Sequence, residues 1–158
     1  MSGEAAGGGG RIDPVYTARV TATGGRGGRV SSGDGVLDLA LTRPPGLGGT
    51  AGDAPGTNPE QLFAAGYAAC FHSALTVVAR AARTAVTGSS VTAEVSIGHH
   101  PGGGYALAAT LVVRLPGLAA GAADDLVRRA HEMCPYSRAT RGNIEVRLFL
   151  GERELTAA

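Results

Sequence analysis

The stretch from Thr57 to Phe71 constrains the fold more than any other, because a helix start there is followed by an apolar run. Asn58 is a favourable N-cap, since its side-chain oxygen can accept a hydrogen bond from a backbone N–H of the first turn. Pro59 at the first helical position loses no hydrogen bond, and Gln61 can return a bond to the cap as in a capping box. The sequence therefore predicts a helix that starts at Pro59 and runs to about residue 82.

Strands are predicted on both sides of this helix, where β-branched and polar residues alternate. In chain order they span residues 15–23, 29–32, 36–41, 91–97, 105–115 and 143–150. A second helix is expected over residues 122–134, with Asp124 and Asp125 in its first turn and Pro135 as its end. The order βββ-α-ββ-α-β predicts an α+β fold, with antiparallel β-sheets around two helices.

A chain of 158 residues is expected to form one domain. We place it at residues 14–151. Residues 1–13 are rich in glycine and alanine and are predicted to be a flexible tail. Residues 152–158 are predicted to be a frayed C-terminal tail.

The composition bears on the partners and the compartment. A net charge of +1 gives no sign of nucleic acid or of an anionic membrane as a partner. No apolar run is expected to reach the about 18 residues of a membrane span without a charge or a break, and no signal peptide is visible. Two cysteines without an export signal fit a reducing cytoplasm, where a disulfide is more often catalytic than structural.

Cys70 is the first candidate for chemistry. Its apolar neighbours are Leu62, Phe63, Tyr67, Phe71 and Leu75. Burial among them would raise the pKa of the thiol above about 8.5, so a reactive thiolate needs a cation nearby. The candidate cations are Arg26, Arg138 and Arg141. A buried packing thiol explains Cys70 equally well.

Cys134 lies on one apolar stripe with Leu126 and Ala130, at spacings of four residues, so it is predicted to face the core. A disulfide needs Cα atoms within about 7 Å, and two facing helices can provide that. Either the two cysteines form a dithiol pair that opens and closes, or they are unrelated core residues.

The sequence also contains the residue types of a metal site and of a phosphate-binding loop. Cys70, His72, His131 and Cys134 are zinc-like residue types. However, the first two are two apart on a helix and point to different sides, so no metal site is predicted and His131 is expected to be solvated. The glycine-rich stretch 24–28 lacks the phosphate-loop pattern and joins strands. It is predicted to be a hairpin tip that presents Arg26.

Three stretches resemble the signature of the organic hydroperoxide resistance proteins, a subfamily of the OsmC-like superfamily. They are GTNPEQLFAAGYAACF at 56–71, YTA with TATGGR within 16–26, and CPYS with ATRGNI within 134–144. The resemblance covers nearly everything from Tyr16 to Leu150. One departure is Gly27, where many members have an acidic residue.

The resemblance implies an intertwined α+β homodimer that acts as a lipoyl-dependent thiol peroxidase. Cys70 matches the peroxidatic cysteine, which becomes a sulfenic acid, and Cys134 matches the resolving cysteine, which closes an intramolecular disulfide. Arg26 matches the arginine that stabilises the thiolate, and Glu60 the carboxylate that orients it. Glu60 and Cys70 are about 15 Å apart along a straight helix. Either the helix therefore breaks near Gly66, or Glu60 serves the partner subunit.

The resemblance also implies the reaction partners. Organic hydroperoxides, including those of fatty acids, would be reduced to alcohols, and lipoamide or a lipoylated protein would supply the dithiol, with no bound cofactor. The residues expected to hold the substrate are Leu62, Phe63, Tyr67, Phe71 and Tyr136. The alternative is a redox-sensing or hydrophobic-ligand-binding module without efficient turnover.

Overall fold

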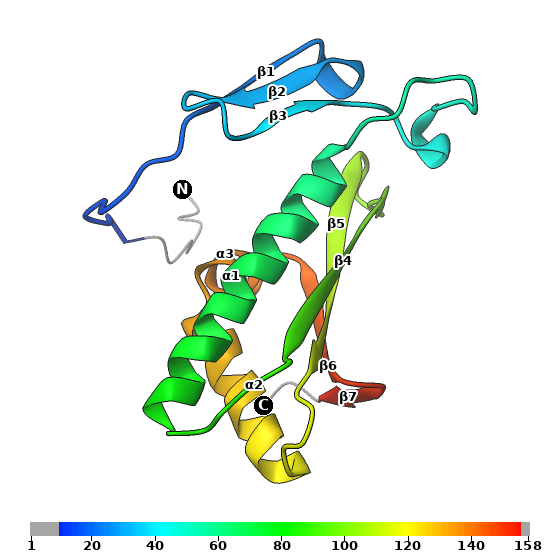
Figure 1. Ribbon diagram of the computed structural model, residues 1–158. Coiled ribbons are helices and arrows are strands. Elements are labelled where there is room, and N and C mark those ends of the chain that lie inside the picture. The colour runs from blue at the N-terminus through cyan, green and yellow to red at the C-terminus, as the bar shows by residue number, and fades with distance from the viewer. Residues whose placement is uncertain (1–9, 156–158) are drawn as a thin grey trace, which may run out of the picture. The chain divides into compact units, whose positions relative to one another are not determined.

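The computed structural model describes residues 10–155, which form two units that divide between Gly56 and Thr57. The first unit contains a three-stranded sheet, and the second contains a four-stranded sheet with α-helices (Figure 1). This confirms the α+β class. Residues 1–9 of the predicted N-terminal tail lie outside the described residues, and residues 10–13 are exposed. The single domain over 14–151 stays a prediction.

The first unit is an antiparallel meander of β1 (Val20–Thr23), β2 (Arg29–Ser32) and β3 (Asp38–Ala40). The 3-10 turn η1 (Gly25–Gly27) joins β1 to β2, and η2 (Pro45–Leu47) follows β3. The predicted hairpin tip is confirmed. A side chain on Gly28 would overlap the carbonyl oxygen of Thr23, so glycine is required there.

The predicted strand 15–23 is too long, and its expected half-burial is wrong. Val20 pairs with Ser32 at the last residue of β2, and the turn at 33–35 follows at once. Residues 15–19 therefore have no partner strand in this ladder, and residues 15–23 are all exposed. Alternation predicts which residues share a face, but it does not provide the partner strand or the layer that would cover that face.

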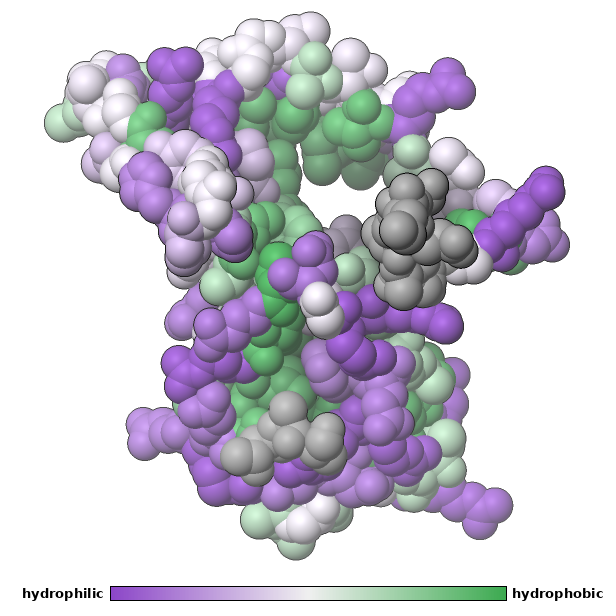
Figure 2. Space-filling view, turned by 180° about the vertical axis from the view of Figure 1, so that it is seen from behind, coloured by the Kyte–Doolittle hydropathy of each residue, from purple (hydrophilic) through white to green (hydrophobic). Residues whose placement is uncertain are grey.

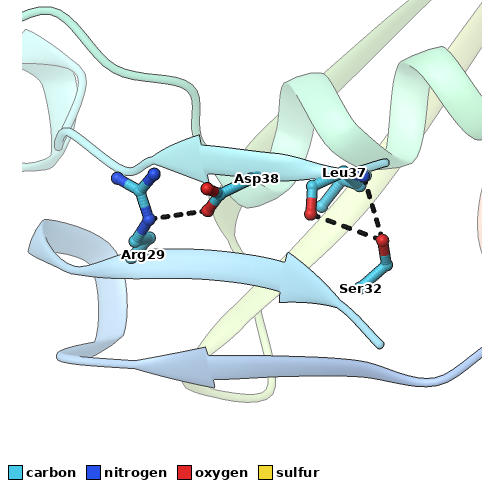
Figure 3. Close-up of polar contacts among 4 residues, drawn as sticks. All are labelled: Arg29, Ser32, Leu37 and Asp38. Atoms are coloured by element: carbon cyan, nitrogen blue, oxygen red, sulfur yellow. Dashed lines mark hydrogen bonds and ion pairs between the residues drawn. The ribbon is translucent and has the colours of Figure 1, made fainter. Parts of the chain in front are cut away.

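Polar side chains connect β2 with β3 and with the residue that precedes β3 (Figure 3). Arg29 Nε donates to Asp38 Oδ1 at 2.6 Å, and the Leu37 N–H donates to Ser32 Oγ at 2.9 Å. The hydrogen bond from Arg29 lowers the pKa of the Asp38 carboxyl. Both charged groups are solvent-exposed, so this ion pair contributes little to stability.

The second unit has the sheet order β4-β5-β6-β7. Its strands are β4 (Ser90–His99), β5 (Tyr105–Arg114), β6 (Glu145–Leu150) and β7 (Arg153–Leu155). The predicted antiparallel pairing is wrong for β5 and β6, which run parallel. The crossover between them contains α2 (Ala120–Met133) and α3 (Pro135–Thr140), and such a crossover is what parallel neighbours need.

Helix α3 is an addition to the predicted order. Pro135 does end α2 as predicted, but it also occupies the first position of α3, where proline is favourable. Helix α2 begins at Ala120, so Asp124 and Asp125 lie beyond its first turn, contrary to prediction.

Strand β7 occupies the stretch that was expected to be a frayed tail. Leu155 pairs with Leu148 and is only 4% exposed. The ladder to β6, this buried leucine and the ion pairs of Glu154 with Arg147 and of Arg153 with Asp124 hold residues 153–155 in place.

Helix α1 (Pro59–Ala81) starts as predicted, with Asn58 Oδ1 accepting from the Gln61 N–H at 2.8 Å. The capping-box return bond is not what the Gln61 side chain forms, because its Oε1 accepts from Thr57 Oγ1 at 2.9 Å. The helix is continuous through Gly66, so the alternative of a break there is wrong.

The core of the second unit forms where α1 meets α2 and the sheet. Its largest fully buried apolar side chains are Tyr67, Phe71, Leu75, Leu111, Val113, Leu126 and Val127. Contrary to the expectation from the sequence, α1 is long and apolar enough to cross a membrane by length and composition. Its buried stripe, from Tyr67 to Ala79, instead packs in this core, as in the central helix of a soluble protein.

Large hydrophobic side chains also remain exposed. Figure 2 shows hydrophobic residues between hydrophilic ones on the face seen there. Those with the largest exposed fractions are Ile12, Val15, Tyr16, Val36 and Tyr105. Four of these five belong to the first unit, in which Val30 and Leu41 are the buried hydrophobic residues among those that the structure describes.

Arg83 ends α1 in a left-handed conformation, with φ of +54°. The Thr84 N–H donates to Ala79 O at 2.9 Å and the Arg83 N–H to Arg80 O at 3.0 Å, which is a Schellman motif. Glycine adopts this conformation without steric cost. We therefore expect Arg83→Gly to raise the free energy of unfolding by about 0.5–1 kcal/mol in urea denaturation.

The matched control is Gly88→Ala, at a glycine with φ of +72°, which should lower the same free energy. If the free energy of unfolding of Arg83→Gly is unchanged or lower, the Arg83 side chain stabilises the fold by at least as much as its left-handed conformation destabilises it.

Candidate functional site

Both cysteines belong to the second unit. Cys70 lies in α1 and is partly exposed, whereas Cys134 lies between α2 and α3 and is fully buried. Both are free thiols, and Cys134 is near enough to Cys70 to raise the pKa of the Cys70 thiol. The structure thus brings together the two cysteines that the sequence singles out.

Cys134 is held at a sharp break in the helical backbone. Its φ and ψ of −63° and 123° are extended, so it serves as C-cap of α2 and N-cap of α3. Its N–H donates to Ala130 O at 2.9 Å, and its carbonyl oxygen accepts from the Arg138 N–H at 3.0 Å. The apolar stripe predicted for Leu126, Ala130 and Cys134 is confirmed, since all three are buried.

The surroundings of Cys70 favour the neutral thiol. Burial raises its pKa, the backbone N–H of Tyr136 opposes this, and the neighbouring Cys134 raises it again. A group with a raised pKa reaches its thiolate form only as the pH rises through that pKa, so chemistry near neutral pH needs a cation.

The predicted charged residues lie in different parts of the chain. Arg26 is in η1 of the first unit, and Glu60 is in the first turn of α1. Of the other two candidate cations, Arg138 is exposed on α3. Arg141 uses its Nη2 to donate to the backbone oxygen of His131 at 2.9 Å.

The second unit has a cavity of about 400 Å³, and neither cysteine is among its lining residues. Its walls are Phe63, Leu107, Pro135, Tyr136, Ala139, Thr140, Asn143 and Ile144. Pro135 and Tyr136 directly follow Cys134, and most of the lining side chains are apolar. Such a cavity can take an apolar ligand.

The cavity contains only some of the residues predicted to bind the substrate. Phe63 and Tyr136 line it. Leu62 is half-buried and is not among the lining residues, and Tyr67 and Phe71 are fully buried in the core. Sequence reasoning missed Leu107 and Ile144, because they come from β5 and from the loop before β6, and only the tertiary packing brings them to the cavity.

Tyr136 packs tightly over α1 beside two aromatic rings. Its centroid lies 5.9 Å from that of Phe63 and 5.7 Å from that of Tyr67. A Cβ on Gly66 would lie 2.6 Å from the Tyr136 hydroxyl oxygen. The glycine therefore leaves the space that this ring occupies.

This close approach should reverse the usual effect of alanine in a helix. Gly66→Ala would otherwise stabilise α1 by about 1 kcal/mol. Overpacking costs about 1–3 kcal/mol, so we expect the free energy of unfolding to fall by about 1 kcal/mol in urea denaturation.

The control is Gly121→Ala in α2, where an added Cβ meets open space and should raise stability. Adding Tyr136→Phe to Gly66→Ala removes the crowded hydroxyl and should restore most of the loss. A gain of stability in Gly66→Ala alone would contradict the crowding.

A buried set of hydroxyl groups surrounds the break at Cys134. Tyr67 Oη lies 3.0 Å from Ser137 Oγ and 3.2 Å from Thr140 Oγ1. His131 Nδ1 lies 2.9 Å from Ser137 Oγ. Thr140 Oγ1 donates to the backbone oxygens of Tyr136 and Ser137 at 3.0 and 3.2 Å. We call these four side chains, Tyr67, His131, Ser137 and Thr140, the hydroxyl cluster.

The expectation that His131 is solvated is wrong. Its ring is partly buried, 6.4 Å from that of Phe71. Burial lowers its pKa and Arg141 lowers it further, while Glu132 acts in the opposite sense. The signal that could have located it is its spacing of three residues before Cys134, on the buried side of α2.

His72, the other histidine of the zinc alternative, has a different partner. Its Nε2 lies 3.0 Å from Ser89 Oγ. Among residues 10–155, no three histidine, cysteine, aspartate or glutamate side chains are grouped so that they could hold a metal ion.

Comparison with known proteins gives a consistent result. The family model for OsmC-like proteins matches residues 51–149. The chain is 50% identical over 137 residues to the organic hydroperoxide resistance protein of Xanthomonas axonopodis pv. citri, an alignment that covers 86% of this chain and 94% of that protein. It is 49% identical to OhrA of Bacillus subtilis, covering 88% of this chain and 98% of the relative.

Solved structures agree with the sequence matches. The crystal structure of the organic hydroperoxide resistance protein OhrB of Bacillus subtilis aligns with a TM-score of 0.81 at 47% identity, over 87% of this chain and 99% of that one. The crystal structure of an organic hydroperoxide resistance protein from Legionella pneumophila aligns with a TM-score of 0.82 at 46% identity, over 88% of this chain and 99% of that one.

Proposed function

The chain belongs to the OsmC-like family, among its organic hydroperoxide resistance proteins, and we propose that it reduces organic hydroperoxides to alcohols with its two cysteines. One observation carries this proposal. Two free thiols are near enough for one to raise the pKa of the other, and the two residues that follow Cys134 line an apolar cavity. The relatives' role in hydroperoxide resistance supports the substrate class.

The reaction consumes one peroxide bond and two thiols. The Cys70 thiolate attacks the terminal oxygen of ROOH, the O–O bond breaks, and the alkoxide takes a proton and leaves as ROH. Cys70 is then a sulfenic acid. The Cys134 sulfur attacks the Cys70 sulfur, the S–S bond forms and water leaves. The buried position of Cys134 beside Cys70 suits this step.

A second dithiol must then reduce the disulfide. We propose dihydrolipoamide or a lipoylated protein as this co-substrate, which gives up two electrons and two protons and becomes the cyclic disulfide. No resident cofactor takes part in this scheme. We also propose a cytoplasmic location, because two free cysteines suit a reducing compartment.

The test is turnover of t-butyl hydroperoxide under excess dihydrolipoamide. Many equivalents of peroxide per protein chain should be consumed. The apolar cavity also favours a second candidate, a redox-sensing or hydrophobic-ligand-binding module. Such a module would bind an apolar ligand, or have its thiols oxidised once, without further turnover of peroxide. Consumption of a single equivalent under excess dithiol would select that candidate.

We propose that Arg26 stabilises the Cys70 thiolate and that Glu60 orients this arginine. The raised pKa of Cys70 supports the need for a cation. Helix α1 is continuous, so Glu60 and Cys70 are about 15 Å apart along its axis. This spacing supports a homodimer in which Glu60 serves the partner subunit's thiol.

Mixed dimers test this arrangement. Combining Cys70→Ser subunits with Glu60→Gln subunits leaves one heterodimer site with an intact cysteine and an intact glutamate. We expect purified heterodimers to show about half the wild-type dimer's peroxidase rate, because one of two symmetric sites is complete. Each homodimeric variant should be far less active.

The control mixes Cys70→Ser with Cys134→Ser subunits. Both thiols belong to one chain in the proposed mechanism, so this heterodimer should stay inactive. Equal inactivity of both heterodimers would place Glu60 in its own subunit's site.

A further inference from the structure

The hydroxyl cluster joins the three helices that carry or flank the two thiols. Tyr67 lies in α1, three residues before Cys70. His131 and Ser137 lie three residues before and after Cys134, in α2 and α3. Contacts of 2.9 Å and 3.0 Å join Ser137 to His131 and to Tyr67. Both helical ends at Cys134 are thus connected by hydrogen bonds to the turn of α1 that precedes Cys70, and Figure 1 shows α2 and α3 beside α1.

The hydrogens of the cluster have one consistent direction. The Thr140 hydroxyl donates to backbone oxygens, which cannot donate in return. Tyr67 must then donate to Thr140, and Ser137 to Tyr67. All three hydroxyl protons are now used, so the contact between Ser137 and His131 requires a proton on Nδ1 of His131. The chain of donors begins at this nitrogen.

We propose that His131 and Ser137 are positioning residues that hold Cys134 against Cys70 and thereby stabilise the Cys70–Cys134 disulfide. The inference rests on the proposed function, since it concerns the disulfide of that reaction. His131 acts as a neutral donor from Nδ1–H to Ser137, and the Ser137 hydroxyl donates in turn to Tyr67 of α1. Neither side chain touches the reacting atoms in this role.

Burial makes this connection strong. Tyr67 and Ser137 are fully buried, and Thr140 nearly so. Buried hydrogen bonds of this kind are costly to leave unmade. Arg141 adds a second tie, because its Nη2 bonds the His131 backbone oxygen from the end of α3. The backbone on either side of Cys134 therefore has little freedom to move the thiol away from Cys70.

The expected effect concerns the equilibrium with a reference dithiol. Protein dithiol and oxidised lipoamide exchange two electrons and two protons to give protein disulfide and dihydrolipoamide. Cys134 is already a neighbour of Cys70 in the reduced protein, so the cluster favours the disulfide by keeping the two sulfurs at high effective concentration. Loss of one buried hydrogen bond is typically worth about fivefold in such an equilibrium constant.

The test measures this equilibrium constant in wild type, Ser137→Ala, Tyr67→Phe and three His131 variants. We expect Ser137→Ala and Tyr67→Phe to lower it by about fivefold, which raises the reduction potential by about 20 mV. Tyr67→Phe serves as the second variant if Ser137→Ala does not fold. Thr76→Val is the matched control, because it removes a hydroxyl bond of α1 outside the cluster.

The His131 variants distinguish the effect of the hydrogen bond from Nδ1 from the effect of the side chain's volume. The amide nitrogen of asparagine lies as many bonds from Cα as Nδ1 does, and that of glutamine lies one bond further. His131→Asn should therefore retain most of the equilibrium constant, while His131→Gln and His131→Leu should lose about fivefold. In wild type, nitrogen NMR should show a protonated Nδ1 and an unprotonated Nε2 at His131.

The outcomes separate the inference from the function it rests on. A wild-type protein that forms no Cys70–Cys134 disulfide on treatment with one equivalent of organic hydroperoxide overturns both. The positioning role alone is overturned if wild type forms the disulfide but the equilibrium constants of both Ser137→Ala and Tyr67→Phe equal or exceed that of wild type. An Nε2–H tautomer overturns the assigned direction of the donors and with it the role of His131.

Discussion

Cys70→Ser is expected to lower the second-order rate constant with cumene hydroperoxide by at least about a thousandfold, because a serine hydroxyl is almost never ionised near neutral pH and is a poor nucleophile. The fold should be retained, since Cys70 is only partly buried and serine is of similar size. Stopped-flow measurement of peroxide consumption under excess dihydrolipoamide gives the rate constant.

Cys134→Ser is the informative companion. It should consume one equivalent of peroxide at close to the wild-type rate and then stop at a Cys70 sulfenic acid, which more peroxide oxidises further. Mass spectrometry distinguishes this species from the wild-type disulfide. A Cys70→Ser protein that still turns over, or a wild-type protein whose disulfides are all between chains, would contradict the assigned roles.

Fatty-acid and aryl-alkyl hydroperoxides are expected to exceed hydrogen peroxide in kcat/KM by at least about a hundredfold, which corresponds to less than 3 kcal/mol. The apolar cavity of about 400 Å³ offers buried surface to a hydrocarbon tail. Each buried methylene contributes up to about 0.8 kcal/mol, and it accelerates the reaction if the tail is also held in the transition state.

Leu107→Asn tests this cavity with little change of size, because it replaces an apolar lining side chain by a polar one. The ratio between linoleic hydroperoxide and hydrogen peroxide should narrow by about tenfold, the effect of losing one to two methylene contacts. Phe71 was expected from the sequence to hold the substrate, which would make Phe71→Ala an obvious test. Since Phe71 is fully buried in the core, that variant is instead expected to destabilise the fold by about 3–5 kcal/mol. Equal rates for all four peroxides, hydrogen, t-butyl, cumene and linoleic, would contradict the role of the cavity.

Local signals in the sequence were reliable where the structure depends on neighbours along the chain. The cap at Asn58, strand β2 and the buried stripe ending at Cys134 appear as predicted. The errors arise where the partner is distant. The parallel pairing of β5 with β6, and the strand made by residues 153–155, depend on which element docks beside which, and alternation does not contain that information.

The candidate site shows the same division. The two thiols were found from their apolar settings and from the family resemblance. The hydroxyl cluster was missed, because Ser137, Thr140 and His131 are polar residues that seem typical of a surface until Tyr67 is placed beside them. Similarly, Leu107 and Ile144 become cavity walls only after β5 and the loop before β6 come together.

The parallel pairing of β5 with β6 also bears on the order of folding. The hairpin of β4 and β5 is local and can form early, whereas β6 cannot pair with β5 until the intervening chain, with α2 and α3, has folded back. Contacts that close such long loops slow folding. The walls at Asn143 and Ile144 directly precede β6, so the cavity is completed only at this late step. During synthesis or refolding, the Cys134 thiol is therefore exposed until β6 has paired with β5. A reducing environment protects this thiol from forming wrong disulfides in that interval.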